Sequence, residues 1–247
     1  MATLDGCYPD TYANKPQTLE VEIKLPTPHK AQKEILDTSK RFNHLRCGRR
    51  FGKTELIKEL CLPILDGHRI GVWYPTYKDS SDVWTEIKST YRHIIKKKDE
   101  TLKKIWLVTG GHIDFWAMEN PESGQGFKYH RAIVDEAAKA SQFRKAWEET
   151  IRPTLTDYEG DAWIMSRPKP NTFFKKLEEL HRGKPNWAFF HYTTFDNPFI
   201  LHDEINSAKE DLDPLTFDQE YMAEYVDPFD RDWETDCQRL YNEKRPN

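Results

Sequence analysis

The sequence lacks the long apolar run that a membrane-spanning helix requires. No stretch of about 18 consecutive apolar residues occurs among its 247 residues, which argues against a transmembrane helix. The amino-terminal residues also lack the apolar core of a signal peptide, so the sequence predicts a chain that stays in the cytosol.

Cysteine is scarce, and its spacing argues against the common metal and disulfide frameworks. The four cysteines are Cys7, Cys47, Cys61 and Cys237. They form no CxxC pair and no Cys/His ligand pattern. The sequence therefore predicts reduced thiols rather than a zinc site or disulfide bonds.

An overall excess of positive charge is also missing. The formal net charge is −4 with histidine neutral, which argues against a chain that coats nucleic acid along its whole surface. Positive charge is nevertheless concentrated in two clusters. The first consists of Lys88, Arg92, Lys96, Lys97, Lys98, Lys103 and Lys104, and the second of Arg167, Lys169, Lys175 and Lys176. Each cluster fits either a contact with a phosphate backbone or a solvated helix face.

The size and composition fit one large α/β domain, or one domain with a small appendage. Apolar residues make up 37% of the chain and the mean hydropathy is −0.84, which is polar for a globular protein. The chain nevertheless contains 8 Trp, 11 Tyr and 13 Phe residues, which supply bulky material for a core.

The residues from Cys47 to Thr54 are typical of a loop that binds the phosphates of a nucleotide. The run is Cys47-Gly48-Arg49-Arg50-Phe51-Gly52-Lys53-Thr54. A predicted strand precedes it and a predicted helix follows it, so backbone N–H groups and the helix dipole would face an anion. Lys53 would reach the outer phosphates, and the Thr54 hydroxyl would bind Mg²⁺. The two glycines enclose three residues instead of the usual four, so Cys47 occupies the place of the first glycine.

Two acidic residues follow a later apolar stretch. Asp135 and Glu136 come directly after Ala132-Ile133-Val134, which reads as a buried parallel strand. Ligands in open α/β sheets bind beyond the carboxyl ends of such strands. Asp135 would hold Mg²⁺ and Glu136 would polarise an attacking water. The alternative is an acidic cap on a solvated helix.

The pattern of apolar residues and turn signals predicts strands that alternate with helices, and hence a mostly parallel sheet. The expected strands are 19–25, 42–46, 69–74, 102–108, 111–118, 132–134, 161–166 and 187–193. The expected helices are 29–38, 54–62, 80–97, 172–182 and a stretch around 143–150.

Seven segments in this order resemble the ATPase domain of the large terminases, the motors that package DNA into tailed-phage heads. The segments are Pro26–Gln32, Gly48–Thr54, Val72–Tyr77, Ile133–Ala138, Met165–Phe174, Thr193–Ile200 and Phe217–Asp227. In the family, the second and fourth are the Walker A and Walker B motifs, and the fifth is the coupling motif. The resemblance covers roughly residues 26–227.

The resemblance implies a P-loop NTPase fold of the additional-strand type, with helices flanking a mostly parallel central sheet. It divides the chain into an arm (1–25), an ATPase core (26–194), a small lid-like region (195–227) and a tail (228–247). The implied activity is Mg²⁺-dependent ATP hydrolysis that drives double-stranded DNA into a viral prohead. The implied partners are DNA, further copies of the chain in a ring, the portal protein and the small terminase subunit, in the host cytoplasm at the prohead portal.

The resemblance also implies roles for single residues. Gln32 would read adenine through its amide, or else be an ordinary exposed helix residue. Arg49 or Arg50 would stabilise charge on the γ-phosphate, or else be surface arginines. Ser166 would sense that phosphate, or else simply end its strand.

Two positions depart from the family pattern. Arg167 stands where the coupling motif usually has a small hydroxyl residue after its serine. Gln125 stands where some terminases carry an arginine that is donated to the ATP of a neighbouring subunit. Lys128 or Arg131 would have to replace it, and we take Arg131 as the candidate, although its place beside the Walker B strand fits a structural role as well.

The carboxyl-terminal 20 residues contain an acidic run but are too few for the nuclease domain of the family. The run consists of Asp230, Asp232, Glu234 and Asp236. It fits a solvated linker better than a two-metal site, so no nuclease activity is expected from this chain. Two alternatives to the motor stay open, namely a nucleotide-binding assembly module with little turnover and a helicase-like ATPase.

Overall fold

The computed structural model describes residues 23–227 of the chain. The expected strand 19–25 lies mostly outside this range, and its residues 23–25 are not in a strand. The acidic run after Asp227 and most of the predicted arm also lie outside the described residues.

The described residues form one eight-stranded sheet with the order β3-β4-β5-β2-β6-β7-β1-β8. The strands are β1 (Phe42–Cys47), β2 (Arg69–Tyr74), β3 (Ile95–Asp99), β4 (Lys104–Leu107), β5 (His112–Ala117), β6 (Arg131–Val134), β7 (Asp161–Ser166) and β8 (Trp187–Tyr192). The six strands from β5 to β8 in this order are parallel, and β3 and β4 form an antiparallel edge. Strand β7 lies between β1 and β6, which confirms the predicted mostly parallel fold of the additional-strand type.

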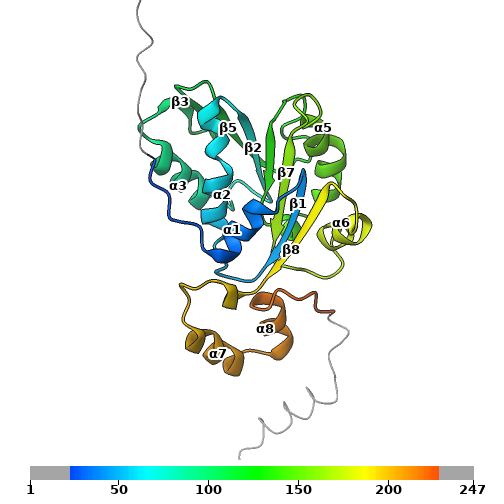
Figure 1. Cartoon of the computed structure of the whole chain (residues 1–247). Coiled ribbons are helices and arrows are strands. Elements are labelled where there is room, and N and C mark those ends of the chain that lie inside the picture. Colours follow the sequence, from blue (N-terminus) through cyan, green and yellow to red (C-terminus); the bar gives the residue numbers. More distant parts are fainter. Residues whose placement is uncertain (1–22, 228–247) are drawn as a thin grey trace, which may run out of the picture.

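Helices cover both faces of the sheet (Figure 1). The helices are α1 (Lys30–Asp37), α2 (Lys53–Leu60), α3 (Ser81–Tyr91), α4 (Phe143–Lys145), α5 (Arg152–Thr154), α6 (Phe173–His181), α7 (His202–Asp211) and α8 (Pro214–Glu220). Helices α1, α2 and α3 pack on one face, and α4, α5 and α6 pack on the other.

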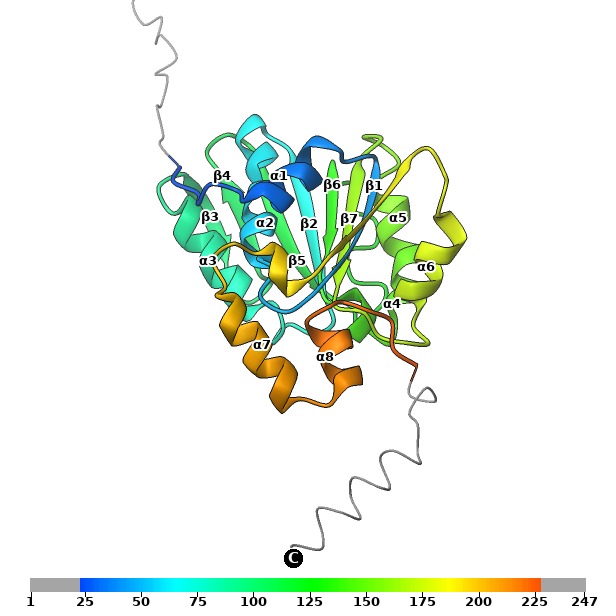
Figure 2. The same ribbon diagram turned by 60° about the horizontal axis from the view of Figure 1, so that its bottom comes forward.

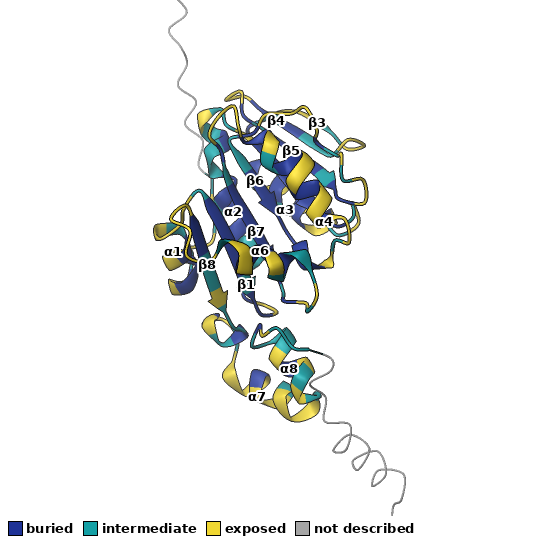
Figure 3. Ribbon diagram, turned by 90° about the vertical axis from the view of Figure 1, so that its right-hand side faces the viewer, coloured by how far each residue is buried: buried dark blue, intermediate teal, exposed yellow. Residues whose placement is uncertain are grey.

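Strands β2, β6 and β7 are mostly apolar because both of their faces are buried. On β6, the side chain of Ile133 belongs to the core on the α1–α3 side, whereas Ala132 and Val134 belong to the core on the α4–α6 side. This alternation is the period of two that a strand imposes on its side chains. Figure 3 shows the central strands as buried and α7 as mostly exposed.

The predicted helix 80–97 is wrong in its last third. Helix α3 ends at Tyr91, and the basic residues Lys96, Lys97 and Lys98 belong to the edge strand β3. Strand β3 pairs with β4 in antiparallel register, with Ile95 opposite Leu107. The three lysines are all exposed, and charged residues of this kind are common on edge strands. The first basic cluster is therefore divided between α3, which carries Lys88, and β3, and is not a single helix face.

The helix expected around 143–150 is built from three connected pieces. Between α4 and α5, the π-helical segment η3 spans Ala146–Ile151. Pro153 follows in α5, directly after this segment. None of the helices within residues 23–227 is both long enough and apolar enough to cross a membrane.

Residues 195–227 leave the sheet after β8 and carry α7 and α8. Both helices lie beyond the carboxyl ends of the parallel strands, on the side where the loop after β1 also lies (Figure 2). We call residues 195–227 the lid, as in the predicted division of the chain.

Candidate functional site

The loop from Gly48 to Gly52 connects β1 to α2 at the carboxyl edge of the sheet. Gly52 has a φ of 104°, which is a left-handed conformation that glycine adopts without strain, and it directly precedes the first turn of α2. Arg50 is also left-handed, with a φ of 60°. Cys47, in the place of the first glycine, is fully buried at the end of β1, and burial raises the pKa of its thiol to about 12.

Lys53 begins α2 and points toward the acidic end of β6. Its Nζ donates a hydrogen bond to Glu136 Oε1 at 2.8 Å and lies 4.0 Å from Asp135 Oδ1. Burial of Lys53 disfavours its charge, but the two carboxylates outweigh burial and raise the pKa of Lys53 above its ordinary value. The ammonium is therefore charged and joins the start of α2 to the residues that follow β6.

Asp135 and Glu136 follow β6 directly, and their environments differ. Burial raises the pKa of Asp135, against the opposing effect of Lys53. Burial acts in the same direction on Glu136, but Lys53 and Arg167 outweigh it and lower the pKa of that carboxyl. The backbone of Glu136 is left-handed, with φ 51° and ψ 36°, a conformation that costs about 1–2 kcal/mol for a residue with a Cβ. Such strained residues cluster at functional sites.

Gln32 is buried against the phosphate loop and is not an exposed helix residue. Its Nε2 donates to the carbonyl of Gly52 at 2.9 Å, and its Oε1 accepts from the backbone N–H of His29 at 3.0 Å. One amide hydrogen of Gln32 remains for a ligand, because Nε2 carries two. The contacts of Gln32 hold the loop, and its reading of adenine stays a prediction.

Ser166, at the end of β7, is buried between β1 and β6. Its Oγ accepts a hydrogen bond from the backbone N–H of Ala138 at 3.1 Å. Ser166 thus touches the segment that follows Glu136. The role of Ser166 in sensing a phosphate stays a prediction.

The arginines of this edge share one carboxylate from the lid. Glu220, at the end of α8, pairs with both Arg49 and Arg167. A guanidinium nitrogen of Arg167 also lies 3.9 Å from Glu136 Oε2. Arg49 and Arg50 are exposed at the loop, and Glu220 was not identified from the sequence because it lies 171 residues from Arg49.

The structure places Arg131 away from Lys53, so its predicted role as an arginine donated to a neighbouring subunit stays a prediction. Arg131 begins β6, at the opposite edge of the sheet from Asp135. Two of its nitrogens donate to Asp161 at 2.7 and 2.6 Å, and a third donates to the carbonyl of Leu60 at 2.8 Å. These contacts use the guanidinium to join β6, β7 and the end of α2.

The two other residues considered for the missing arginine also lie away from Lys53. Lys128 pairs with Asp157 at 2.6 Å, near the amino end of β6. Gln125 is exposed in the loop between β5 and β6, and its backbone N–H donates to the carbonyl of Glu122. Within residues 23–227, neither Lys128 nor Gln125 therefore places a positive charge beside Lys53.

Comparison with known proteins places this geometry in a known fold. No family model matches the chain. The chain is 27% identical over 210 residues to the large terminase subunit of Escherichia phage T5, a match that covers 81% of the chain and 48% of that protein. The ATPase domain of the Thermus phage P74-26 large terminase superposes with a TM-score of 0.70, at 20% identity, over 81% of this chain and 94% of that domain. The fold is that of a phage large-terminase ATPase domain.

Two further terminase structures agree with this assignment. A large terminase from a thermophilic bacteriophage, in complex with ADP, gives a TM-score of 0.66 at 15% identity, and covers 80% of this chain and 54% of that one. The HK97 large terminase gives 0.61 at 15% identity, and covers 82% of this chain and 53% of that one. The resemblance to large terminases predicted from the sequence is confirmed. The chain spans about half the length of the T5 relative that it matches.

In this terminase fold, Thr194, the last residue of the predicted core, and residues of the lid contact the backbone of the phosphate loop. The hydroxyl of Thr194 donates to the carbonyl of Arg49 at 2.8 Å, and the Asn197 amide donates to the carbonyl of Arg50 at 2.6 Å. The backbone N–H of Arg49 donates to the carbonyl of Glu220 at 2.7 Å. The resemblance had included the segments that hold these residues, but no local sequence signal shows which loop carbonyls they would reach.

Gly48 has no room for a side chain between the loop and Tyr221 of the lid. A Cβ on Gly48 would lie 2.4 Å from the Tyr221 carbonyl oxygen and 2.8 Å from Thr194 Oγ1. Backbone atoms cannot move away as a flexible side chain can. We expect Gly48→Ala to lower the free energy of unfolding by about 1–3 kcal/mol through overpacking, measured by urea denaturation.

Gly110→Ala is the comparison for this prediction. A Cβ on Gly110 meets nothing within 4 Å, but its φ of 90° is left-handed, so this variant reports backbone strain alone. Unchanged stability of Gly48→Ala would show that the loop and the lid are not packed as described.

The two basic clusters lie on different elements. In the first, Lys88 and Lys98 pair with Glu100, at 3.0 Å each. In the second, Arg167 pairs with Glu220, and Lys175 lies over the ring of Tyr225. Both clusters are thus partly engaged within the protein, and contact of either with DNA stays a prediction.

Proposed function

We propose that this chain is the ATPase part of a large-terminase motor, which hydrolyses ATP to drive double-stranded DNA into a viral prohead. The observation that carries the proposal is the meeting of Lys53, Asp135 and Glu136 at the carboxyl edge of the sheet. Structures of the thermophilic-phage large terminase in complex with ADP and with ATP-γ-S support a nucleotide as the ligand.

The residues at this edge fit a nucleotide with its metal ion. Lys53 holds a buried positive charge beside two carboxylates, at the first turn of a helix whose N-terminus attracts anions. The Thr54 hydroxyl, one residue further, makes no hydrogen bond within the part of the chain that the structure describes. Carboxylate and hydroxyl oxygens suit Mg²⁺, so Thr54 and Asp135 would hold it.

Each residue then has a task. Bound ATP and Mg²⁺ would supply the phosphoryl group and neutralise part of its charge. The backbone from Gly48 to Gly52 would cradle the phosphates, and Lys53 would turn from the carboxylates to the outer phosphates. Glu136 would orient a water and accept its proton.

The remaining predicted residues would act around this centre. Arg49 or Arg50 would lie along the γ-phosphate and stabilise developing charge. Ser166 would contact that phosphate and, through its hydrogen bond with Ala138, would couple the presence of the phosphate to the position of the segment after Glu136. Gln32 would contact the adenine. Further copies of the chain in a ring, the portal protein and the small terminase subunit would complete the motor.

The decisive measurement is steady-state ATP hydrolysis at rising protein concentration, with and without double-stranded DNA. Assembly in a ring brings neighbouring subunits to each active site. We therefore expect turnover per subunit to rise with protein concentration and to rise further when DNA is added. A rate that responds to neither would contradict the motor proposal.

One observation favours a second candidate, a nucleotide-binding assembly module with little turnover. Arg131 and Lys128 are held in ion pairs and Gln125 carries no charge, so these three described positions offer no free cation to a neighbouring subunit. Tight ATP binding without turnover at every protein concentration would support the module.

A further inference from the structure

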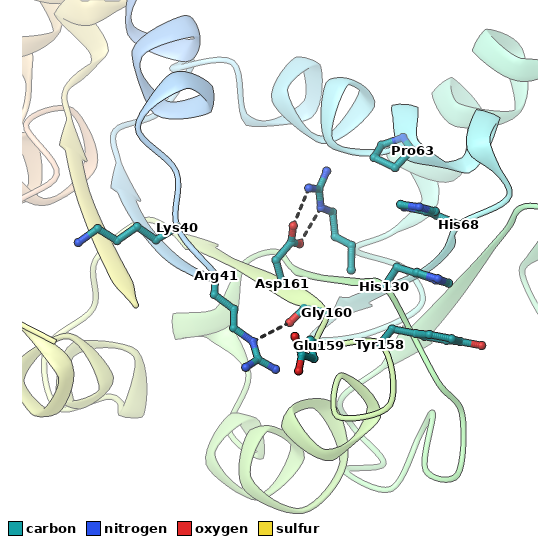
Figure 4. A pocket seen from close by; sticks show the side chains of 10 residues that line it. Lys40, Arg41, Pro63, His68, His130, Tyr158, Glu159, Gly160 and Asp161 are labelled. Carbon is teal, nitrogen blue, oxygen red and sulfur yellow. Dashed lines mark hydrogen bonds and ion pairs between the residues drawn. The ribbon is translucent and has the colours of Figure 1, made fainter. Parts of the chain in front are cut away.

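A cavity of about 450 Å³ opens at the amino edge of the sheet, at the opposite end of the strands from Lys53 (Figure 4). Its lining comes from residues that precede or begin strands, among them Arg41 before β1, His68 before β2 and His130 before β6. Since β1 has six residues, about 20 Å of strand separates this cavity from the phosphate loop. The two sites therefore share no side chain.

Four cations lie at this edge without a carboxylate partner among residues 23–227. They are Lys40, Arg41, Arg69 and Arg152. Two nearby carboxylates are already engaged, because Asp161 pairs with Arg131 and Asp157 pairs with Lys128. Glu159 is the remaining acidic residue of the cavity lining, which also contains Lys40 and Arg41, so the lining carries a net positive charge.

Two of these cations contact the same aromatic ring. The guanidinium carbons of Arg41 and Arg152 lie 5.3 and 5.0 Å from the centroid of the same Phe42 ring. Burial, and then the charge of Arg41, lower the pKa of Arg152. Like charges held together without a counterion repel each other, and a bound polyanion would relieve that repulsion.

The ends of helices explain part of this charge. Lys40 and Arg41 follow α1, and Arg69 follows the short helix η1 (Leu62–Asp66). The carboxyl end of a helix carries roughly half a negative charge, which favours a nearby cation. Half a charge from each short helix does not balance a full charge on each of these side chains, so an excess remains.

Three stacked rings form a rigid support beside the cations. The ring centroids of His68 and His130 are 4.4 Å apart, and those of His130 and Tyr158 are 3.8 Å apart, with the planes within 8° of parallel. The backbone N–H of Arg69 donates to His130 Nδ1 at 3.1 Å, and the N–H of His130 donates to the carbonyl of Arg69 at 2.9 Å. The backbone that carries the Arg69 side chain is thus held in place, which lowers the entropy cost of binding through it.

We propose that this amino edge is a binding surface for the phosphate backbone of DNA, with Lys40, Arg41, Arg69 and Arg152 as the contacting cations. The exposed Tyr158 adds a hydroxyl that can donate to a phosphate oxygen. The surface reads no base sequence, because it offers charge rather than a constellation of groups for base edges. The proposal rests on the proposed function in taking DNA as the partner.

The test is the salt dependence of DNA affinity without ATP, measured by fluorescence anisotropy on a short duplex. Lys40→Gln combined with Arg69→Gln removes two exposed side chains, and thermal unfolding checks that the variant is folded. We expect the slope of log K against log salt to become shallower by about 1.8, or about 0.9 for each lost phosphate contact. The same strand without its complement is the second probe, with a smaller change of about 0.7 for each contact.

Lys33→Gln combined with Lys209→Gln is the matched control, because it removes two exposed lysines from α1 and α7 and should keep the wild-type slope. An unchanged slope in the Lys40 and Arg69 variant would overturn the proposal. The proposal would also be overturned if the slope became shallower only in the variant that combines Lys96→Gln with Lys97→Gln on β3. DNA binding needs no ATP hydrolysis, so this test and the test of the motor can fail separately. If the protein shows no turnover but the Lys40 and Arg69 variant still has the shallower salt dependence, the result supports this surface and contradicts only the proposed motor.

Discussion

Replacing Glu136 by glutamine is expected to lower ATP turnover by about 10²–10⁴-fold while ATP still binds. Glutamine has nearly the same shape, and its Oε1 can still accept the hydrogen bond that Lys53 now donates at 2.8 Å. It cannot accept a proton from water, so the variant loses the proposed base and keeps the contacts that position the loop. The measurement is steady-state hydrolysis together with equilibrium binding of a fluorescent ATP analogue.

Glu148→Gln is the matched control for this variant. Glu148 is exposed and pairs with Arg144 on the far face of the sheet, so its loss should leave turnover and binding unchanged. Hydrolysis at the wild-type rate in Glu136→Gln would remove Glu136 from the proposed chemistry and leave Asp135 as the alternative base.

Lys53→Ala is expected to weaken ATP binding and to destabilise the nucleotide-free protein as well. Removing one partner of a buried charge pair costs about 2–5 kcal/mol in binding, which corresponds to roughly 30- to 5,000-fold in affinity. In the free protein, the same change leaves Asp135 and Glu136 side by side without their cation. We expect the free energy of unfolding to fall by about 3 kcal/mol, measured by urea denaturation, because Asp135 is buried.

Lys58→Ala separates the two effects of this change. Lys58 lies on the same helix and pairs with Glu55 and Glu86, so its loss should lower stability but leave ATP affinity unchanged. Wild-type ATP affinity in Lys53→Ala would contradict the placement of the phosphates at the start of α2.

The sequence predicted the sheet well because its signals are local. Short strand-like stretches followed within two residues by glycine or proline mark these strands, and those at residues 42–46, 69–74 and 161–166 match β1, β2 and β7 within one residue. The order of motifs along the chain then predicted which strand ends meet at the site. The contact of Lys53 with Glu136 follows from that order.

What the sequence did not predict depends on contacts between distant residues. Helix 80–97 was extended too far because Ile94 and Ile95 continue the apolar spacing of α3, whereas pairing with β4 makes the second of them part of a strand. The hydrogen bond of Gln32 to Gly52 and the ion pair of Glu220 with Arg49 were not predicted, because each joins residues that are far apart in the sequence and meet only in the folded chain.

The burial of Cys47 and Cys61 has a practical consequence for fluorescent labelling. Both thiols are fully buried, and burial raises the pKa of each to about 12, so neither forms the thiolate that maleimides attack. Cys7 and Cys237 are the two other cysteines of the chain. With those two changed to serine, one cysteine introduced on the lid and a second on β3 would become the two sites open to dye. Donor and acceptor dyes could then follow the lid against the sheet during single rounds of hydrolysis, with both native core thiols left in place.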